Sequence, residues 1–416
     1  MNKAVILVGG PSRATRFRPL SMNMPQPLFP VGGKPIIWHQ VSKIASVPGI
    51  QEILLLGVFE EHVFQTFLDQ CSTEYPHITF KYLREYALLG TAGGLHHFRD
   101  LIKRGNPKNI FLLYTDICSS FPLEELLEKH EKSNSMGTIM VKKVPKSDLS
   151  KFGYVVPDAE NNMALHYVEK PETYISDLVS TGVYVFTPKI FDLIAELIEK
   201  RSSELSSLSK KAFRAEFSES HDFLRLEQDV LQYMASHNLL SIFITCDFWR
   251  QIKSAASAVS ANAEYLMQAK KNSESYITCQ NSQGPTIIGA VYIHPSATVD
   301  PSAKIGPNVS IHARANIGAG VRVKNSIVLD NVSISDNAIV INAIVGWSSK
   351  IGQWARVEGS PCTAQNENTV EYSSPNAFSI CILGQDTIVR NESFVRSCIV
   401  LPHKEITHDH HNLILM

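Results

Sequence analysis

The sequence has no long apolar run. Its first apolar stretch, Ala4–Val8, ends at Gly9 and is far shorter than the roughly 18 apolar residues that a membrane-spanning helix needs. No small-residue cleavage pattern follows this stretch, so the sequence gives no sign of a secretory signal either. We therefore expect a cytoplasmic protein with no membrane partner.

Paired cysteines and an excess of charge are also missing. The seven cysteines are scattered without a C-x-x-C pair, which argues against a zinc site and against the disulfide framework of a small secreted domain. The 39 Lys and Arg residues balance 40 Asp and Glu residues, for a net charge of -1. Because nucleic acids are bound by strongly basic surfaces, we expect no nucleic-acid partner.

The sequence does contain an alternation of short apolar runs and amphipathic stretches. The runs typical of buried parallel strands are Ala4–Val8, Ile53–Leu56, Ile110–Leu113 and Val183–Phe186. Stretches between them, such as Leu123–His130 and Ile190–Leu197, have apolar residues at helical spacing. This alternation predicts a doubly wound, Rossmann-like α/β domain, which we place at residues 1–272. Residues 201–219 are rich in Ser, Lys and Glu and predict an exposed loop.

From Ile287 onward the apolar period becomes six residues. The first series is Ile287, Ile293, Val299, Ile305, Ile311, Ile317, Val323 and Leu329. It slips after Leu329 and recovers at Ile339. This hexapeptide repeat predicts a left-handed parallel β-helix at residues 285–416, and such a domain most often serves assembly, so we expect a homo- or hetero-oligomer. The polar tail Thr407–Asn412 is expected to be mobile and not to form a metal site through its histidines.

The first strand leads into a glycine turn. Gly9 and Gly10 would let backbone N–H groups approach phosphate oxygens, and Arg16 further along the loop supplies positive charge. Together with the Pro25-Gln26-Pro27 segment and Lys34, this region resembles the G-G-x-G-T-R-x-x-P-L and P-K-P signatures of nucleotidyltransferases. It departs from them by two extra loop residues after Gly10 and by Gln26, which replaces the lysine that contacts the reacting phosphates.

Two further segments fit a nucleotide site. The segment around Gly90 and Thr91 resembles the L-G-T-A-G motif of the same family, which contacts base and ribose; alternatively, Thr91 only caps a helix. Asp116 follows a predicted strand, at a place where an acidic residue can hold Mg²⁺ against phosphates and where the family has one of its two metal carboxylates. The alternative for Asp116 is a turn aspartate that caps nearby serines.

The last motifs concern the sugar and the metal. Glu169-Lys170-Pro171 resembles the E-K-P motif, whose glutamate binds a sugar hydroxyl and whose lysine neutralises the sugar-linked phosphate. Thr181 and Gly182 match the sugar-contact strand that follows it. Gln251, however, replaces the aspartate that would complete the Mg²⁺ site in the motif W-x-D-I-G. Since a hard dication prefers carboxylates to neutral amides, we expect Mg²⁺ to find only an incomplete site, in which Asp116 is retained and Gln251 replaces the second carboxylate.

Nearly the whole chain resembles the sugar-nucleotide pyrophosphorylase family, and within it the α subunits of mannose-1-phosphate guanylyltransferase. The resemblance implies a regulatory subunit that binds GDP-mannose and restrains a catalytic β subunit as feedback inhibition. A preserved sugar and nucleotide pocket with damaged metal and phosphate chemistry suits binding without turnover.

Two alternatives stay open. An active enzyme would make GDP-mannose from mannose 1-phosphate and GTP, with Arg16, Asp116 and Lys170 as its catalytic residues. A scaffold subunit of a nucleotide-exchange complex would share the two-domain architecture and would not need an intact E-K-P site.

Overall fold

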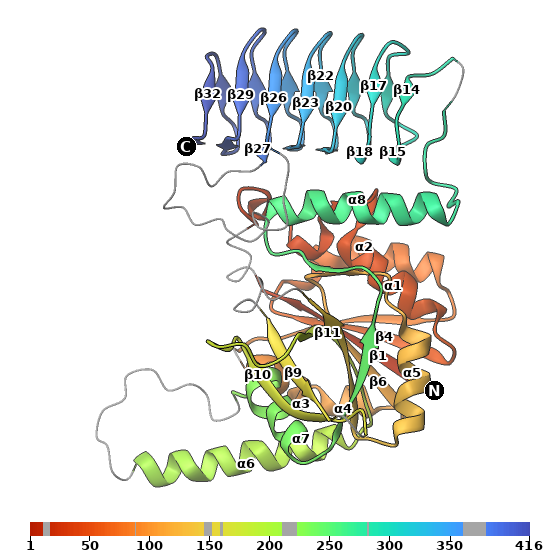
Figure 1. The fold of residues 1–416 in the computed structure, drawn as a ribbon, viewed down its shortest axis with the longest axis vertical. Coiled ribbons are helices and arrows are strands. Elements are labelled where there is room, and N and C mark those ends of the chain that lie inside the picture. The colour runs from red at the N-terminus through yellow and green to blue at the C-terminus, as the bar shows by residue number, and fades with distance from the viewer. Residues whose placement is uncertain are drawn as a thin grey trace. The chain divides into compact units, whose positions relative to one another are not determined.

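The structure is a computed structural model that describes residues 1–10, 17–87, 89–144, 152–158, 161–209, 223–280, 283–360 and 380–416, the side chains of 204–209 excepted. Arg16 lies outside these ranges. The chain forms two compact units (Figure 1). Met1–Gly10 and His39–Trp249 belong to the first, Pro11–Trp38 and Arg250–Met416 to the second.

The first unit is built on a nine-stranded mixed sheet. Its parallel part has the order β6-β1-β4-β5. These strands are β1 (Asn2–Gly9), β4 (Ile50–Gly57), β5 (Thr79–Arg84) and β6 (Asn109–Tyr114). Successive side chains of a strand point to opposite faces, and the neighbours Val5 and Ile6 are both fully buried. The sheet is therefore covered on both faces, which explains the continuous apolar runs and confirms the predicted α/β domain.

The other part of the sheet is mostly antiparallel. Its strands are β8 (Gly137–Lys143), β9 (Gly153–Pro157), β10 (Ala164–Glu169), β11 (Leu178–Phe186) and β12 (Leu240–Thr245). Strand β11 runs antiparallel to both β6 and β8, so the prediction of a parallel strand at Val183–Phe186 is wrong in direction. All of β11 is buried. A continuous apolar run reports burial on both faces and carries no information on strand direction.

Helices pack on this sheet (Figure 1). One apolar core joins buried side chains of β1, β4 and β6 to α3 (Gly90–His97), α4 (Arg99–Lys103), α6 (Ile190–Ser209), the π-helical turn η6 (Leu226–Leu231) and α7 (Gln232–Ser236). The remaining elements are α1 (Ile36–Ser46), α2 (Glu61–Glu74), α5 (Leu123–Ser133) and the short β7 (Ile117–Ser119). Among the described residues, no helix has the length and apolarity that a bilayer requires.

Helix α6 extends further than the sequence indicated. It continues to Ser209, so the prediction of a loop is wrong for residues 201–209; residues 210–219 lie outside the described residues. Once a helix has been started by a buried apolar face, adding each further residue costs little, even for serine. Polar composition alone therefore did not locate the end of this helix.

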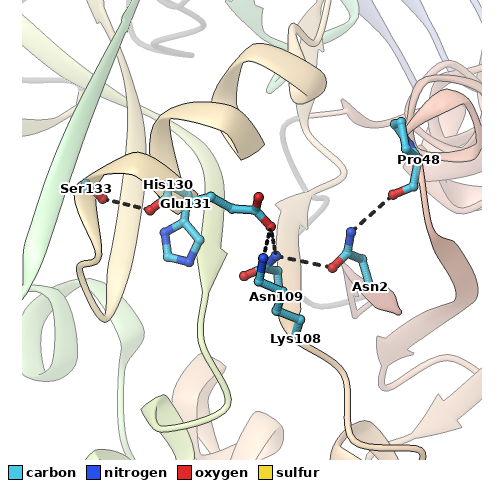
Figure 2. Close-up of polar contacts among 7 residues, drawn as sticks. All are labelled: Asn2, Pro48, Lys108, Asn109, His130, Glu131 and Ser133. Atoms are coloured by element: carbon cyan, nitrogen blue, oxygen red, sulfur yellow. Dashed lines mark hydrogen bonds and ion pairs between the residues drawn. The ribbon is translucent and has the colours of Figure 1, made fainter.

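A polar network joins the amino ends of β1 and β6 to α5 (Figure 2). Asn109 Nδ2 donates to Asn2 Oδ1 at 3.2 Å and to Glu131 Oε1 at 3.0 Å. Glu131 also accepts from Lys108 Nζ at 2.7 Å, which holds the pKa of Glu131 below its ordinary value. Asn2 Nδ2 donates to the Pro48 carbonyl oxygen at 3.1 Å. Hydrogen bonds within the unit thus connect the amino ends of these two strands to α5.

The neighbouring His130 predicts how the first unit responds to acid. Burial lowers the pKa of His130 from 6.5 to about 4, and its Nδ1 lies 2.8 Å from Thr138 Oγ1. Between pH 6.5 and pH 4, His130 binds a proton in the unfolded chain but stays neutral in the folded chain. The stability is therefore complete above pH 6.5 and falls by about 3 kcal/mol as the pH drops to 4.

His130→Gln should flatten this part of the curve of unfolding free energy against pH. Urea denaturation at a series of pH values measures the curve, and the exposed His77, replaced in the same way, is the control. Equal slopes for the wild type and His130→Gln would contradict the assignment.

The second unit contains three parallel sheets of short strands, as in a β-helix (Figure 1). The first sheet is β14 (Thr286–Ile287), β17 (Lys304–Ile305), β20 (Arg322–Lys324), β23 (Ile339–Ile341), β26 (Arg356–Glu358), β29 (Phe394–Arg396) and β32 (His410–His411). The second is β15 (Val291–Ile293), β18 (Val309–Ile311), β21 (Ile327–Val328), β24 (Ala343–Val345), β27 (Cys381–Leu383), β30 (Ile399–Val400) and β33 (Ile414–Leu415). The third is β16 (Thr298–Val299), β19 (Asn316–Ile317), β22 (Ser333–Ile334), β25 (Lys350–Ile351), β28 (Ile388–Val389) and β31 (Glu405–Ile406). The prediction of a parallel β-helix is confirmed.

The slip in the six-residue series has a structural cause. Ile311 pairs with Val328, and Val323 pairs with Val340. The inward position is therefore one residue before the predicted Leu329, and later one residue after the predicted Ile339. The chain between β20 and β21 is one residue shorter than the repeat requires. The prediction of the repeat is correct, and the predicted register is wrong by one residue at Leu329 and at Ile339. The inward positions that the six-residue series predicts further on, Val345, Ile351 and Val357, are confirmed.

The polar tail forms the last coil of the β-helix. Strand β32 pairs with β29, and β33 pairs with β30, while Asp409 Oδ1 accepts from the Phe394 N–H at 2.8 Å. The prediction of a mobile terminus is therefore wrong, because backbone pairing orders a coil whatever its outward side chains are. No group of metal-binding side chains occurs among the described residues, this tail included.

A ladder of asparagines follows the β-helix. Asn308, Asn325 and Asn342 all have positive φ. Asn308 Nδ2 donates to Asn325 Oδ1, and Asn325 Nδ2 donates to Asn342 Oδ1, both at 3.1 Å. The ladder ends where Asn342 Nδ2 donates to the Gly359 carbonyl oxygen at 2.9 Å. Asparagine tolerates the left-handed backbone better than most residues, so one residue type serves both the turn and the ladder.

Helix α8 (Ala255–Lys271) packs against the β-helix within the second unit (Figure 1). Its buried Asn262 accepts at Oδ1 from the Gly32 N–H at 2.9 Å and from Ser310 Oγ at 2.6 Å. Gly32 lies between β2 (Pro30–Val31) and β3 (Lys34–Pro35), after the short helices η3 (Leu20–Met22) and η4 (Gln26–Leu28). One side chain thus joins this N-terminal segment to the β-helix.

Candidate functional site

The predicted phosphate-binding glycines lie at the carboxyl end of β1. Gly9 has a φ of +69°, and no described atom lies within 4 Å of the point that a Cβ would occupy. Gly10 follows it beside Val58. The backbone at Gly9 is therefore open on one side, as phosphate binding by N–H groups requires.

The predicted base and ribose segment is held against the start of η6. Gly90 has a φ of +75°, and a Cβ there would lie 2.3 Å from the Leu224 carbonyl oxygen, so only glycine fits. Two N–H groups of α3 donate to the same oxygen. Thr91 does not cap its own helix; its Oγ1 accepts from the Leu226 N–H at 2.8 Å. The alternative of a Thr91 helix cap is thus wrong for α3, since the hydroxyl serves η6.

Next to Thr91 lies a carboxylate that no motif had indicated. The Tyr114 hydroxyl donates to Glu227 Oε1, and Thr91 Oγ1 lies 3.5 Å from Glu227 Oε2. Burial raises the pKa of Glu227, and the charge of Glu169 raises it further. Glu227 therefore links Thr91, in the predicted nucleotide segment, to Tyr114, the last residue of β6. Tyr114 precedes Asp116 by two residues.

The predicted sugar residue Glu169 belongs to the same cluster. The Tyr167 hydroxyl donates to Glu169 Oε2 at 3.0 Å, and the hydroxyls of Ser180 and Tyr184 are 3.0 Å apart. Burial raises the pKa of Tyr184 well above its ordinary value, with contributions from the charges of Glu227, Glu169 and Asp116. The charges of these three carboxylates therefore all reach Tyr184. Thr91 lies beside one of them, Glu227.

The other predicted sugar-site residues lie close by in the chain and differ in exposure. Lys170 is exposed and has a φ of +48°. Thr181 is fully buried, and its Oγ1 donates to the Met140 carbonyl oxygen at 2.7 Å. Gly182 has a φ of +79°, and a Cβ there would lie 2.7 Å from Ile117 Cδ1. The hydroxyl of Thr181 is therefore engaged inside the unit, and its sugar contact stays a prediction.

The two substituted motif positions lie near each other in the second unit. Gln26 Nε2 donates to the carbonyl oxygen of Ile252, which follows Gln251 at the end of β13 (Trp249–Gln251). Gln251 Oε1 is buried and has no hydrogen-bond partner among the described residues. Where the family motifs have a lysine and an aspartate, this chain has the neutral amides of Gln26 and Gln251. Two amides are poor ligands for Mg²⁺.

Comparison with known proteins shows the family of this chain. The family profile for Nucleotidyl transferase matches residues 3–271, and that for the GMPPB C-terminal domain matches residues 287–415. The mannose-1-phosphate guanylyltransferase regulatory subunit alpha of Dictyostelium discoideum is 41% identical over 421 residues, which cover 100% of this chain and 98% of the relative. The chain belongs to the α-subunit family of mannose-1-phosphate guanylyltransferase.

Other members and relatives of this family are equally similar over the full length. The regulatory subunit alpha of Papio anubis is 40% identical, with 100% of each chain covered. The "Probable mannose-1-phosphate guanyltransferase" of Schizosaccharomyces pombe is 43% identical, over 98% of this chain and 97% of the relative. A UDP-glucose pyrophosphorylase structure with UDP-glucose has a TM-score of 0.50 and 17% identity over 64% of this chain and 98% of its own. That likeness supports the fold alone.

Glu227 could have been found from the sequence. It lies in the stretch Leu224–Tyr233, whose apolar residues predict a helix. It precedes the buried Val230 and Leu231 by three and four residues, so a helical projection puts it on the apolar face. An acidic residue on that face needs a partner or a function.

Proposed function

We propose that this protein is a regulatory subunit that binds GDP-mannose and, when loaded, restrains a catalytic β subunit of mannose-1-phosphate guanylyltransferase. One observation carries the proposal. Glu169 is retained at the predicted sugar position, where the Tyr167 hydroxyl donates to it, and Asp116 is retained at the predicted metal position, whereas Gln26 and Gln251 replace the motif residues that contact reacting phosphates and metal. The names of full-length relatives support the same role.

Binding a sugar nucleotide and transferring its nucleotidyl group require different side chains. Nucleotidyl transfer needs a metal ion and cationic side chains to stabilise charge on the phosphates. Binding a sugar nucleotide needs hydrogen-bond acceptors for hydroxyls and donors for phosphates. Loss of the first set lowers kcat and leaves the affinity for the ligand. We therefore propose binding that does not require Mg²⁺, with Asp116 as the one remaining carboxylate of the metal site, in a cytoplasmic hetero-oligomer.

A reconstituted complex tests the regulatory role. Purified catalytic β subunit should lose activity at lower GDP-mannose concentration when this chain is present than when it is absent. Lys170→Met should raise the inhibitory concentration at least 10-fold, because the predicted phosphate contact is lost, without changing the uninhibited rate. Lys132→Met, an exposed position on α5, is the matched control. Identical inhibition curves with and without this chain would contradict the proposal.

An active enzyme is the second candidate. Asp116 is retained at the predicted metal position, and the Schizosaccharomyces pombe relative carries the plain transferase name. This candidate predicts formation of GDP-mannose from GTP and mannose 1-phosphate by the isolated chain, and loss of that activity in Asp116→Asn.

A further inference from the structure

We infer that Glu227 is a second hexose-binding carboxylate of this site, and that it accepts hydrogen bonds from sugar hydroxyls together with Glu169. The inference rests on the proposed function and adds a residue that the motifs do not contain. The ligand class is a sugar nucleotide, and the part recognised by Glu227 is its pyranose ring.

The position of Glu227 is the first argument. One carboxylate oxygen accepts from Tyr114 on β6, and the other lies 3.5 Å from Thr91 on α3. Tyr114 precedes the predicted metal residue by two positions, and Thr91 belongs to the predicted ribose segment. The side chain of Glu227 is half-buried, so it retains access to solvent and to a ligand.

The charge of Glu227 is the second argument. Tyr114 and Thr91 each offer one hydroxyl donor, and a neutral glutamine could hold both hydroxyls at a lower desolvation cost. A carboxylate has about four acceptor sites, of which these two contacts use two. Among the described residues no Lys or Arg forms an ion pair with Glu227. A half-buried carboxylate whose partners among the described residues are hydroxyl groups is typical of a functional site.

The neighbouring carboxylate is the third argument. The charges of Glu227 and Glu169 both raise the pKa values of Tyr167 and Tyr184. The two carboxylates therefore lie within electrostatic reach of the same pair of rings. Acceptors set around aromatic rings match the polyhydroxyl edge and apolar face of a pyranose. The two negative charges also repel each other, and hydrogen bonds donated by sugar hydroxyls would stabilise both carboxylates.

The experiment compares two ligands on three proteins. Isothermal titration with GDP-mannose and with GDP is carried out on the wild type, Glu227→Gln and Glu74→Gln, all as the full chain. Glu74, at an exposed position on α2, also accepts from a tyrosine hydroxyl, that of Tyr75 at 3.0 Å. It is therefore the matched control. We expect Glu227→Gln to weaken GDP-mannose binding 10- to 100-fold and GDP binding less than 3-fold, with an unchanged melting temperature. Tyr114→Phe, which removes one local partner, should change GDP-mannose binding less than Glu227→Gln does.

The outcomes separate the inference from the proposed function. If the wild type binds no GDP-mannose, the proposed function is wrong and the inference is lost with it. If the wild type binds and Glu227→Gln binds equally well, the inference alone is overturned. Equal weakening of GDP and GDP-mannose would also overturn it, because Glu227 would then act on the nucleotide segment through Thr91.

Discussion

Gly90→Ala is expected to lower the unfolding free energy of the first unit by about 3 kcal/mol and to remove GDP-mannose binding. A left-handed φ costs alanine about 1 kcal/mol, and the new Cβ would lie 2.3 Å from the Leu224 carbonyl oxygen. Since that atom is backbone, relief requires a shift of α3 away from residues 224–226. The shift breaks the contact between Thr91 and Leu226, on which the predicted nucleotide-side geometry depends.

Gly49→Ala separates the two causes of this loss. Gly49 has a φ of +77°, almost the same as Gly90, but the nearest atom to its added Cβ is Asn2 Nδ2 at 3.6 Å, an ordinary contact. Gly49→Ala should therefore lose about 1 kcal/mol for backbone strain alone. Urea denaturation and titration with GDP-mannose measure both variants. If the two substitutions cost the same, the close approach at Leu224 does not exist in solution.

Asn325→Ala has the second largest expected effect, a loss of about 3 kcal/mol in the unfolding free energy of the β-helix. The substitution removes both ladder hydrogen bonds of Asn325, and it leaves Asn308 Nδ2 and Asn342 Oδ1 without their partners. Asn342 is buried and Asn308 is half-buried, and an unsatisfied buried polar group costs about 1 to 3 kcal/mol. Alanine also adopts the φ of +44° less readily than asparagine. Because each coil of a solenoid is supported only by its neighbours, the whole β-helix should unfold at a lower temperature.

Asn331→Ala is the matched control for the ladder. Asn331 has a φ of +60° and is exposed, and its Oδ1 accepts from Arg314 Nε at 2.7 Å. Its replacement therefore brings the same kind of backbone strain with one surface hydrogen bond lost. Differential scanning calorimetry should show a clearly larger fall in melting temperature for Asn325→Ala. A fall no larger than that of Asn331→Ala would mean that the ladder does not stabilise the coils.

The sequence predicted the fold where burial alone determines the pattern. The apolar runs at β1, β4 and β6 and the six-residue repeat each record which side chains are inside, and these elements were predicted correctly. Burial does not record direction, so β11 was assigned to the wrong orientation. It also does not record register once a turn shortens by one residue, as at Val328. The last coil was missed because its order comes from backbone pairing with β29 and β30.

The candidate site was predicted in part. Motifs indicated Asp116, Glu169 and Thr91. In the structure the charges of Asp116 and Glu169 both act on Tyr184, and Thr91 lies beside Glu227. The sequence could not show that Gln26 bonds the backbone beside Gln251, because that contact depends on tertiary structure. Apolar periodicity alone does not single out Glu227, because it marks the buried face of the helix and does not register a charged residue on that face.

The most direct test of this account is isothermal titration of the purified chain with GDP-mannose, with and without Mg²⁺, followed by a turnover assay with GTP and mannose 1-phosphate on the same sample. We expect GDP-mannose to bind with similar affinity with and without Mg²⁺, and we expect no formation of GDP-mannose from GTP and mannose 1-phosphate. Turnover by the chain alone, or the absence of binding under both conditions, would contradict it.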